Sequence, residues 1–247
     1  MELRAFERRG EAEAALAREI AELIRAAARA RRRCALGLAA GRSPLGLYAE
    51  LARLHRAEGL SFSGVDVFQV DEFAGIGPDH PASFRRFLRE HFLDLVDLAP
   101  DAAHLLDGER PAEEACAAYE AAIRAAGGID LQVLGLGWNG HVGFNEPGSD
   151  AASRTRRVAL HAGSRAAAAA SLGCEVPAHA LTLGLGTLAE ARRLRLLAFG
   201  AAKAEAVGAL MGGAPGAELP AAHLRGHPDA QLLVDAAAGA LCRRGSP

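Results

Sequence analysis

The sequence carries little net charge, since 28 lysines and arginines stand against 30 aspartates and glutamates and the formal charge is −2 at pH 7. A field this weak argues against a nucleic-acid partner and favours a small molecule. The basic run at 31–33 closes an Ala-rich helical stretch, where cations favour the helix C-terminus. We therefore interpret this run as the end of a helix and expect no nucleic-acid binding.

Closely spaced cysteine pairs and long apolar runs are also missing. The four cysteines, at positions 34, 116, 174 and 242, form no Cys-x-x-Cys pair that could hold a metal or perform redox chemistry. No segment reaches the about 20 apolar residues of a membrane span, and the charged N-terminus lacks the apolar run of a secretory signal. We expect reduced cysteines, no metal, no membrane partner and a cytoplasmic location.

Helical and strand patterns alternate along the 247 residues, and neither an internal repeat nor a long linker interrupts them. The patterns predict helices over 11–30, 43–59, 84–96, 112–128 and 201–211, and strands over 34–41, 65–70, 129–137, 180–188, 193–200 and 231–239. Ser43 is the expected N-cap of the second helix, with Pro44 at its first position. This order indicates a single α/β domain over 1–247, with a mostly parallel sheet flanked by helices.

Ligands of open α/β sheets bind at the carboxyl ends of the strands, and the first such end here contains Gly41, Arg42 and Ser43. Backbone N–H groups, the dipole of the following helix and the serine hydroxyl favour a phosphate or another anion there. The alternative is a glycine that only lets the chain bend.

At the second strand end, Asp71 and Glu72 follow an apolar segment. Side chains alternate along an extended chain, so only one of the two can point into the crevice. A carboxylate shielded from water there could act as a general base toward a carbon acid. The alternative is that the pair caps the following turn.

The third strand end, over 135–149, carries the most information. Its glycines permit tight turns, while Asn139, His141, Asn145 and Glu146 place polar groups close together after a buried strand. An imidazole can exchange a proton near neutral pH, and a nearby carboxylate can orient it, so His141 and Glu146 form a candidate pair. A single loop histidine is more often structural, but the whole group favours catalysis.

These segments resemble the glucosamine-6-phosphate deaminase family. The resembling stretches run in that family's order from about residue 36 to residue 235 and read GLAAGRSPLGLY, FQVDEFAGI, HPASF, GLGWNGHVGFNEPGS, SRTR, ALTLGLGTL and FGAAKAEAV. The block GHVGFNEP is the most specific, because the related 6-phosphogluconolactonases share the fold and a glycine-rich loop with a histidine but do not normally continue as Phe-Asn-Glu-Pro. The resemblance implies a Rossmann-like fold of the type shared with ribose-5-phosphate isomerase and CoA transferase.

The same resemblance implies conversion of glucosamine 6-phosphate to fructose 6-phosphate with release of ammonia, without a cofactor. Carried over by position, Asp71 moves a proton between C2 and C1, and His141 opens the sugar ring with Glu146 as its partner. Asn139 completes this catalytic group. The phosphate is expected on Gly41, Arg42 and Ser43, with Lys203 supplying a positive charge.

The sequence departs from the family at several positions. Some members have aspartate in place of Asn139, although an asparagine can still orient an imidazole. Ala170 stands where the family usually has an arginine that binds the substrate phosphate. Our hypothesis is that Arg42, where the family more often has glycine, supplies the missing charge; the alternative is another amino-sugar phosphate as substrate.

The activator pocket of allosteric members is matched only in part. Ser149 and Arg156 agree with it, but Val158 replaces its lysine, so we expect no strong allosteric activation. Two other functions remain open, a 6-phosphogluconolactonase-like hydrolase and a sugar-phosphate-binding protein without turnover. A homo-oligomer also remains open, because interface and core residues share the same pattern.

Overall fold

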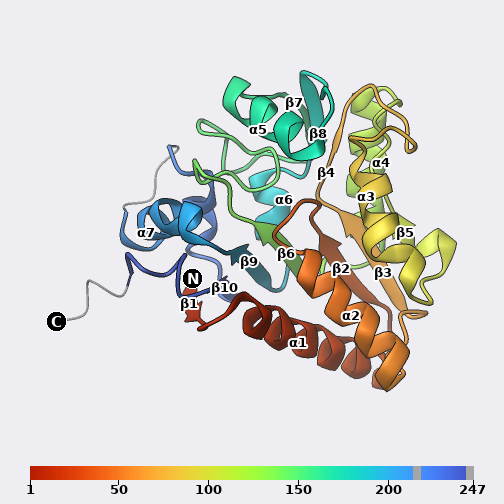
Figure 1. Ribbon diagram of the computed structural model, residues 1–247. Coiled ribbons are helices and arrows are strands. Elements are labelled where there is room, and N and C mark those ends of the chain that lie inside the picture. The colour runs from red at the N-terminus through yellow and green to blue at the C-terminus, as the bar shows by residue number, and fades with distance from the viewer. Residues whose placement is uncertain (214–217, 243–247) are drawn as a thin grey trace.

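A sheet of seven parallel strands forms the centre of the computed structural model, which describes residues 1–213 and 218–242 (Figure 1). The strand order is β1-β10-β9-β6-β2-β3-β5, and every neighbouring pair is parallel. The inner strands are almost wholly buried, as expected for a parallel sheet that is covered on both faces. In sheet order the strands are Glu2–Ala5, Ala230–Val234, Leu194–Ala198, Leu131–Gly135, Cys34–Leu38, Val65–Gln69 and Ala103–His104.

Helices cover the two faces of this sheet and bury separate apolar clusters against it. One face packs against α1 (Arg9–Arg29), α2 (Leu45–Glu58) and part of α3 (Phe84–His91). The other face packs against α4 (Ala112–Ala125), α6 (Leu185–Ala189) and α7 (Ala204–Gly212). Four short 3₁₀ segments complete the helical elements of the described chain, at Leu93–Leu95, Pro100–Ala102, Ala201–Lys203 and Pro220–Leu224. None of the helices in the described ranges is long and apolar enough to cross a membrane.

The order of the strands reverses between β2 and β6. From β2 the chain continues to β3 and β5 on one side, and it then returns to β6, β9 and β10 on the other. Loops that leave two such strands separate from each other and open a crevice at the carboxyl edge, the usual ligand site of open α/β sheets. The segments after β2 and β6 are therefore placed side by side.

A second, smaller sheet stands above this edge together with α5 (Ala162–Leu172) (Figure 1). Its strands are β4 (Asp71–Phe73), β8 (His179–Thr182) and β7 (Arg156–Ala159), and both pairings are antiparallel. The sheet and α5 enclose their own apolar cluster, which includes Phe73 and Phe144. Residues of this layer, such as Phe144 and Ser164, line the crevice at that edge.

The predicted fold class is confirmed, whereas several boundaries are wrong. The helix after β2 begins at Leu45 and Pro44 is its N-cap, without a side-chain cap, so Ser43 does not cap it. The segment predicted as a strand over 180–188 divides into β8 and α6, and the helix predicted over 84–96 ends at His91. The second sheet and the edge strand β1 were not predicted.

Candidate functional site

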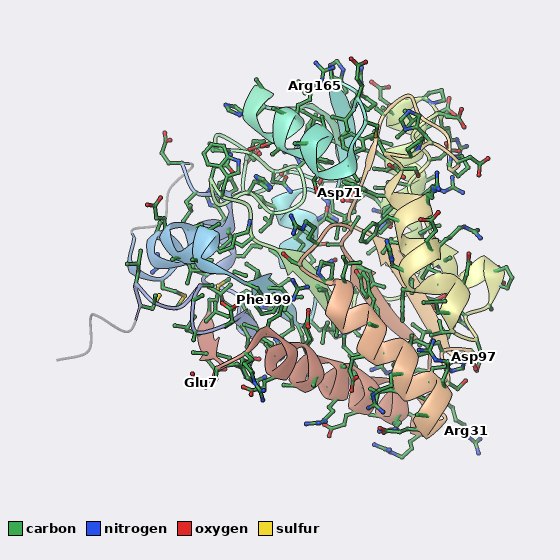
Figure 2. All side chains as sticks on the ribbon, viewed as in Figure 1. Glu7, Arg31, Asp71, Asp97, Arg165 and Phe199 are labelled. Atoms are coloured by element: carbon green, nitrogen blue, oxygen red, sulfur yellow. The ribbon has the colours of Figure 1, made fainter. Side chains whose placement is uncertain are left out.

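A cavity of about 280 Å³ lies at the carboxyl ends of β2 and β6, under α5. Figure 2 shows Asp71 inside the molecule below α5, whereas Arg165 of the same helix lies at the outer surface. Most of the predicted site residues line this cavity, namely Gly41, Arg42, Ser43, Asp71, His141 and Lys203. The structure thus brings together segments that lie far apart in the sequence.

Asp71 and Glu72 point in opposite directions, as expected for neighbours on an extended strand. Asp71 lines the cavity and is 7% exposed, and its pKa is raised to about 8, mainly by burial and secondly by the charge of Glu72. Glu72 is 1% exposed and accepts hydrogen bonds at the start of α3, from the Ser83 hydroxyl and from the backbone N–H groups of Phe84 and Arg85. The first carboxyl is therefore available to a ligand, and the second fixes a helix.

The loop over 135–146, called here the histidine loop, comes closest to Asp71 at Gly143. Gly143 has φ +57°, and a Cβ built on it would lie 2.8 Å from Thr182 Oγ1 and 3.5 Å from Asp71 Oδ2. A side chain there would be strained by the left-handed backbone and crowded by Thr182. The glycine lets the histidine loop approach the carboxyl on β4.

Asn139 bridges His141 and Glu146. Its amide nitrogen donates to Glu146 Oε2 at 2.7 Å, so its oxygen faces the imidazole and lies 2.6 Å from His141 Nδ1. An amide oxygen only accepts hydrogen bonds, hence Nδ1 carries the proton and Nε2 of the neutral ring is free to accept one. Asn139 and Glu146 stand behind the imidazole and are not among the residues that line the cavity.

Two further titratable groups of the cavity are biased toward their neutral forms. Burial lowers the pKa of His141, and Lys203 lowers it further, while Glu146 acts in the opposite direction. Burial also lowers the pKa of Lys203, a half-buried side chain that has no ion-pair partner among the described residues. A negatively charged ligand would stabilise the ammonium form of this lysine.

The loop after β2 is held from outside the cavity. Gly41 has φ +104°, and the guanidinium of Arg9 donates to the carbonyl oxygens of Arg42 and Ser43. The Arg42 side chain is exposed and has no acidic partner in the described part of the chain. It lines both this cavity and a neighbouring one of about 430 Å³. Arg42 is therefore free to meet an anion.

Ala170 is exposed on α5 and lines neither of these cavities. Residues at the end of that helix, Ser171 and Leu172, line the neighbouring cavity together with Arg42. Ala170, where the family usually has an arginine, thus lies at the end of α5 that borders the neighbouring cavity.

Several residues of the cavity wall were not predicted from the sequence. Trp138, Phe84 and Phe144 contribute apolar surface, and Ser164 lines the cavity from the first turn of α5. Ser164 belongs to no motif, and an Ala-rich helix gives no signal of a site. Across residues 1–213 and 218–242, no group of three or more His, Cys, Asp or Glu side chains is arranged to hold a metal ion.

Fold and site together define an α/β protein with an acid–base site for a small anionic ligand at the carboxyl edge of a parallel sheet. A family model described as "Glucosamine-6-phosphate isomerases/6-phosphogluconolactonase" matches residues 7–234. The chain belongs to this family.

Individual relatives agree with this assignment. A protein of Arthrobacter sp. (strain FB24) named glucosamine-6-phosphate deaminase is 50% identical over 192 residues, which cover 76% of this chain and 73% of the relative. Glucosamine-6-phosphate deaminase 2 of Bacillus subtilis is 43% identical over 76% of this chain and 77% of its own length.

Solved structures extend the comparison to the fold. A structure described as a monomeric glucosamine-6-phosphate deaminase is 36% identical, with a TM-score of 0.92 over 98% of this chain and 100% of that one. The 6-phosphogluconolactonase of Thermotoga maritima is 22% identical, with a TM-score of 0.76 over 95% of this chain and 99% of that one, and shares the fold.

Proposed function

We propose that this chain is an enzyme that converts glucosamine 6-phosphate and water to fructose 6-phosphate and ammonia. The observation that carries the proposal is that Asp71 and His141, from β4 and from the loop after β6, line one cavity with the loop at Gly41 and with Lys203. An aldose–ketose conversion requires a base at carbon, an acid or base at oxygen and a site for the phosphate. Each requirement has a residue in this cavity.

In the proposed reaction, Nε2 of His141 accepts the proton of the hydroxyl at C1 and then returns it to the ring oxygen. This transfer opens the sugar ring. The Asp71 carboxylate then removes the proton from C2 and delivers it to C1, while the oxygen on C1 gains a proton and the amine nitrogen loses one, so that C1 is reduced to an alcohol and C2 is oxidised to an imine. Water adds to the imine, and ammonia leaves. Asn139 and Glu146 hold the imidazole in the required tautomer.

The phosphate is proposed to lie on the loop of Gly41, Arg42 and Ser43, with Lys203 opposite. Arg42 and Lys203 are the cations of the cavity wall, and neither is paired with an acidic side chain among the described residues. The loop of Gly41, Arg42 and Ser43 also leads into α2, whose N-terminal end favours negative charge. An amino-sugar phosphate fits this distribution of charge.

A coupled ammonia assay on glucosamine 6-phosphate beside its galactosamine epimer tests the reaction and the substrate together. We expect ammonia release with at least one of them, and a loss of turnover in Asp71→Asn that exceeds a hundredfold because the base at carbon is removed. Binding without any ammonia would overturn the proposal in favour of a binding protein. Hydrolysis of 6-phosphogluconolactone that survives Asp71→Asn would favour the lactonase, which needs no base at carbon.

A further inference from the structure

The first turn of α5 presents a hydroxyl that the proposed mechanism does not use. Ser164 is 6% exposed and lines the cavity together with Ala167 and Ala168, which follow it at helical spacing. Its Oγ is buried and has no hydrogen-bond partner among the described residues. A buried hydroxyl left unpaired destabilises the folded protein. A serine beside two alanines on the α5 side of the wall therefore indicates a partner that comes from the cavity.

Neither ordinary use of a helical serine accounts for this side chain. Serine often caps a helix, but the cap of α5 is His161, whose Nδ1 accepts from the backbone N–H of Gly163 at 3.2 Å. Serine in a helix also bonds to the carbonyl oxygen four residues earlier, yet no such bond is formed here. The hydroxyl is therefore left without a partner in the described part of the chain.

Ser164 lies at the end of the cavity nearer the histidine loop. A Cβ built on Gly163 would lie 3.4 Å from Cζ2 of Trp138, the residue that directly precedes Asn139. The opposite end of α5, at Ser171 and Leu172, lines the neighbouring cavity. The helix thus runs from the histidine loop toward Arg42, and Ser164 is at the histidine end.

We propose that Ser164 is a substrate-binding residue whose hydroxyl bonds to a sugar hydroxyl of the amino-sugar phosphate, whereas Arg42, Ser43 and Lys203 contact its phosphate. The inference rests on the proposed function of the cavity and adds a specificity contact to it. A site that hydrogen-bonds a substrate hydroxyl discriminates against an analogue in which that group is absent or misplaced, because the buried partner is then left unpaired.

The test uses Ser164→Ala and, as a matched control, Ser171→Ala at the other end of the same helix. Trp138 is the only tryptophan of the sequence, is 55% exposed and lines the cavity, so its fluorescence reports ligand binding in both variants. For Ser164→Ala we expect the Kd and KM for glucosamine 6-phosphate to rise about tenfold, the value of one good hydrogen bond. Ser171→Ala should stay within twofold of the parent, and inhibition by inorganic phosphate should be the same in all three proteins.

Three results would overturn the inference. Unchanged Kd and KM in Ser164→Ala, with a lowered Tm of the free protein, would mean that the serine is structural. Equal weakening of inorganic phosphate and of the sugar phosphate would move the contact to the phosphate. A parent protein that neither binds nor deaminates glucosamine 6-phosphate would instead refute the proposed function, and this inference with it.

Discussion

Asp71 is buried and lines the cavity. Because its pKa is raised, the stability of the folded protein depends on pH. The folded pKa of about 8 lies above the ordinary value of 3.8, so the folded protein holds this proton more tightly than the unfolded chain does. Stability therefore falls as pH rises between these two values, by up to about 1.4 kcal/mol per pH unit. A buried carboxyl that serves chemistry in this way opposes folding.

We accordingly expect Asp71→Asn to be inactive but more stable than the parent. The neutral amide removes the buried charge, so the gain in the free energy of unfolding should be larger at pH 8 than at pH 5. Urea denaturation at both pH values measures it, with Asp79→Asn as a control at an exposed aspartate. A gain that is equal at the two pH values would show that Asp71 is ionised in the folded protein throughout this range.

Arg42 is expected to supply the positive charge that the family usually places at position 170. Removing a charged hydrogen bond to phosphate should cost about 1.5–3 kcal/mol, so Arg42→Ala should raise KM by about 10- to 100-fold. Arg86→Ala serves as a control, because Arg86 faces the neighbouring cavity and is paired with Glu90 at 2.6 Å. An unchanged KM in Arg42→Ala would rule out this role.

A gain-of-function variant tests the same idea from the other side. Adding Ala170→Arg to Arg42→Ala should restore much of the lost affinity if the two positions substitute for each other. If it does not, while a different amino-sugar phosphate is turned over faster by the parent, the alanine reflects a changed substrate instead.

The site residues at the strand ends could be predicted from the sequence, because each lies within a few positions of a strand that the apolar pattern indicates. Asp71 and His141 were found in this way. The bridge through Asn139 was not, because the direction of an amide depends on the partner that the fold supplies at Glu146. Ser164 gave no signal, since it reaches the cavity only after α5 folds over the sheet edge.

Glu72 joins two elements, since it extends from β4 to the start of α3. One oxygen accepts from the backbone N–H groups of Phe73 and Phe84, and the other from Ser83 Oγ and the N–H of Arg85. The sequence left open whether the Asp-Glu pair acts in chemistry or caps the following turn. In the structure Glu72 instead accepts at the start of the more distant α3, whose N-cap is Ser83. The charge of Glu72 also raises the pKa of Asp71.

Glu72→Gln should therefore change both stability and pH dependence. Loss of the charged acceptor is expected to lower the free energy of unfolding by about 1–3 kcal/mol. Since the kcat/KM requires ionised Asp71, the parent should lose activity as pH falls below about 8, and this limb should move to lower pH in the variant. The matched control is Glu90→Gln, at an exposed glutamate of α3. An acid limb that does not move would separate Glu72 from the titration of Asp71.

Elements of the parallel sheet could be predicted because their strands are continuous apolar runs that alternate with helices. The second sheet could not, since its strands contain only three or four residues and their partners lie about a hundred residues away in the case of β4 and β8. The apolar pattern over 180–188 fits both a strand and a helix, and the turn at Gly184 that divides it follows from tertiary packing.

At the scale of the molecule, the two residues that match an activator pocket are bonded within the chain. Arg156 donates to Asn145 Oδ1 at 2.9 Å and to Ser149 Oγ at 3.3 Å, and Asn145 donates to the carbonyl oxygens of Val142 and Leu183. The arginine thus fastens the small sheet to the histidine loop. An activator phosphate at this place would meet an engaged guanidinium and, at Val158, no cation.

We therefore expect a hyperbolic dependence of velocity on glucosamine 6-phosphate, with a Hill coefficient near one. N-acetylglucosamine 6-phosphate should leave the curve unchanged, because coupling between sites requires an effector that binds two states of the protein differently. The measurement is a saturation curve with and without this compound. Light scattering at the same enzyme concentration gives the molecular mass, and so the oligomeric state, to which the curve applies. A sigmoidal curve that the compound makes hyperbolic would show that a second site exists and that Arg156 can exchange its internal partners for a ligand.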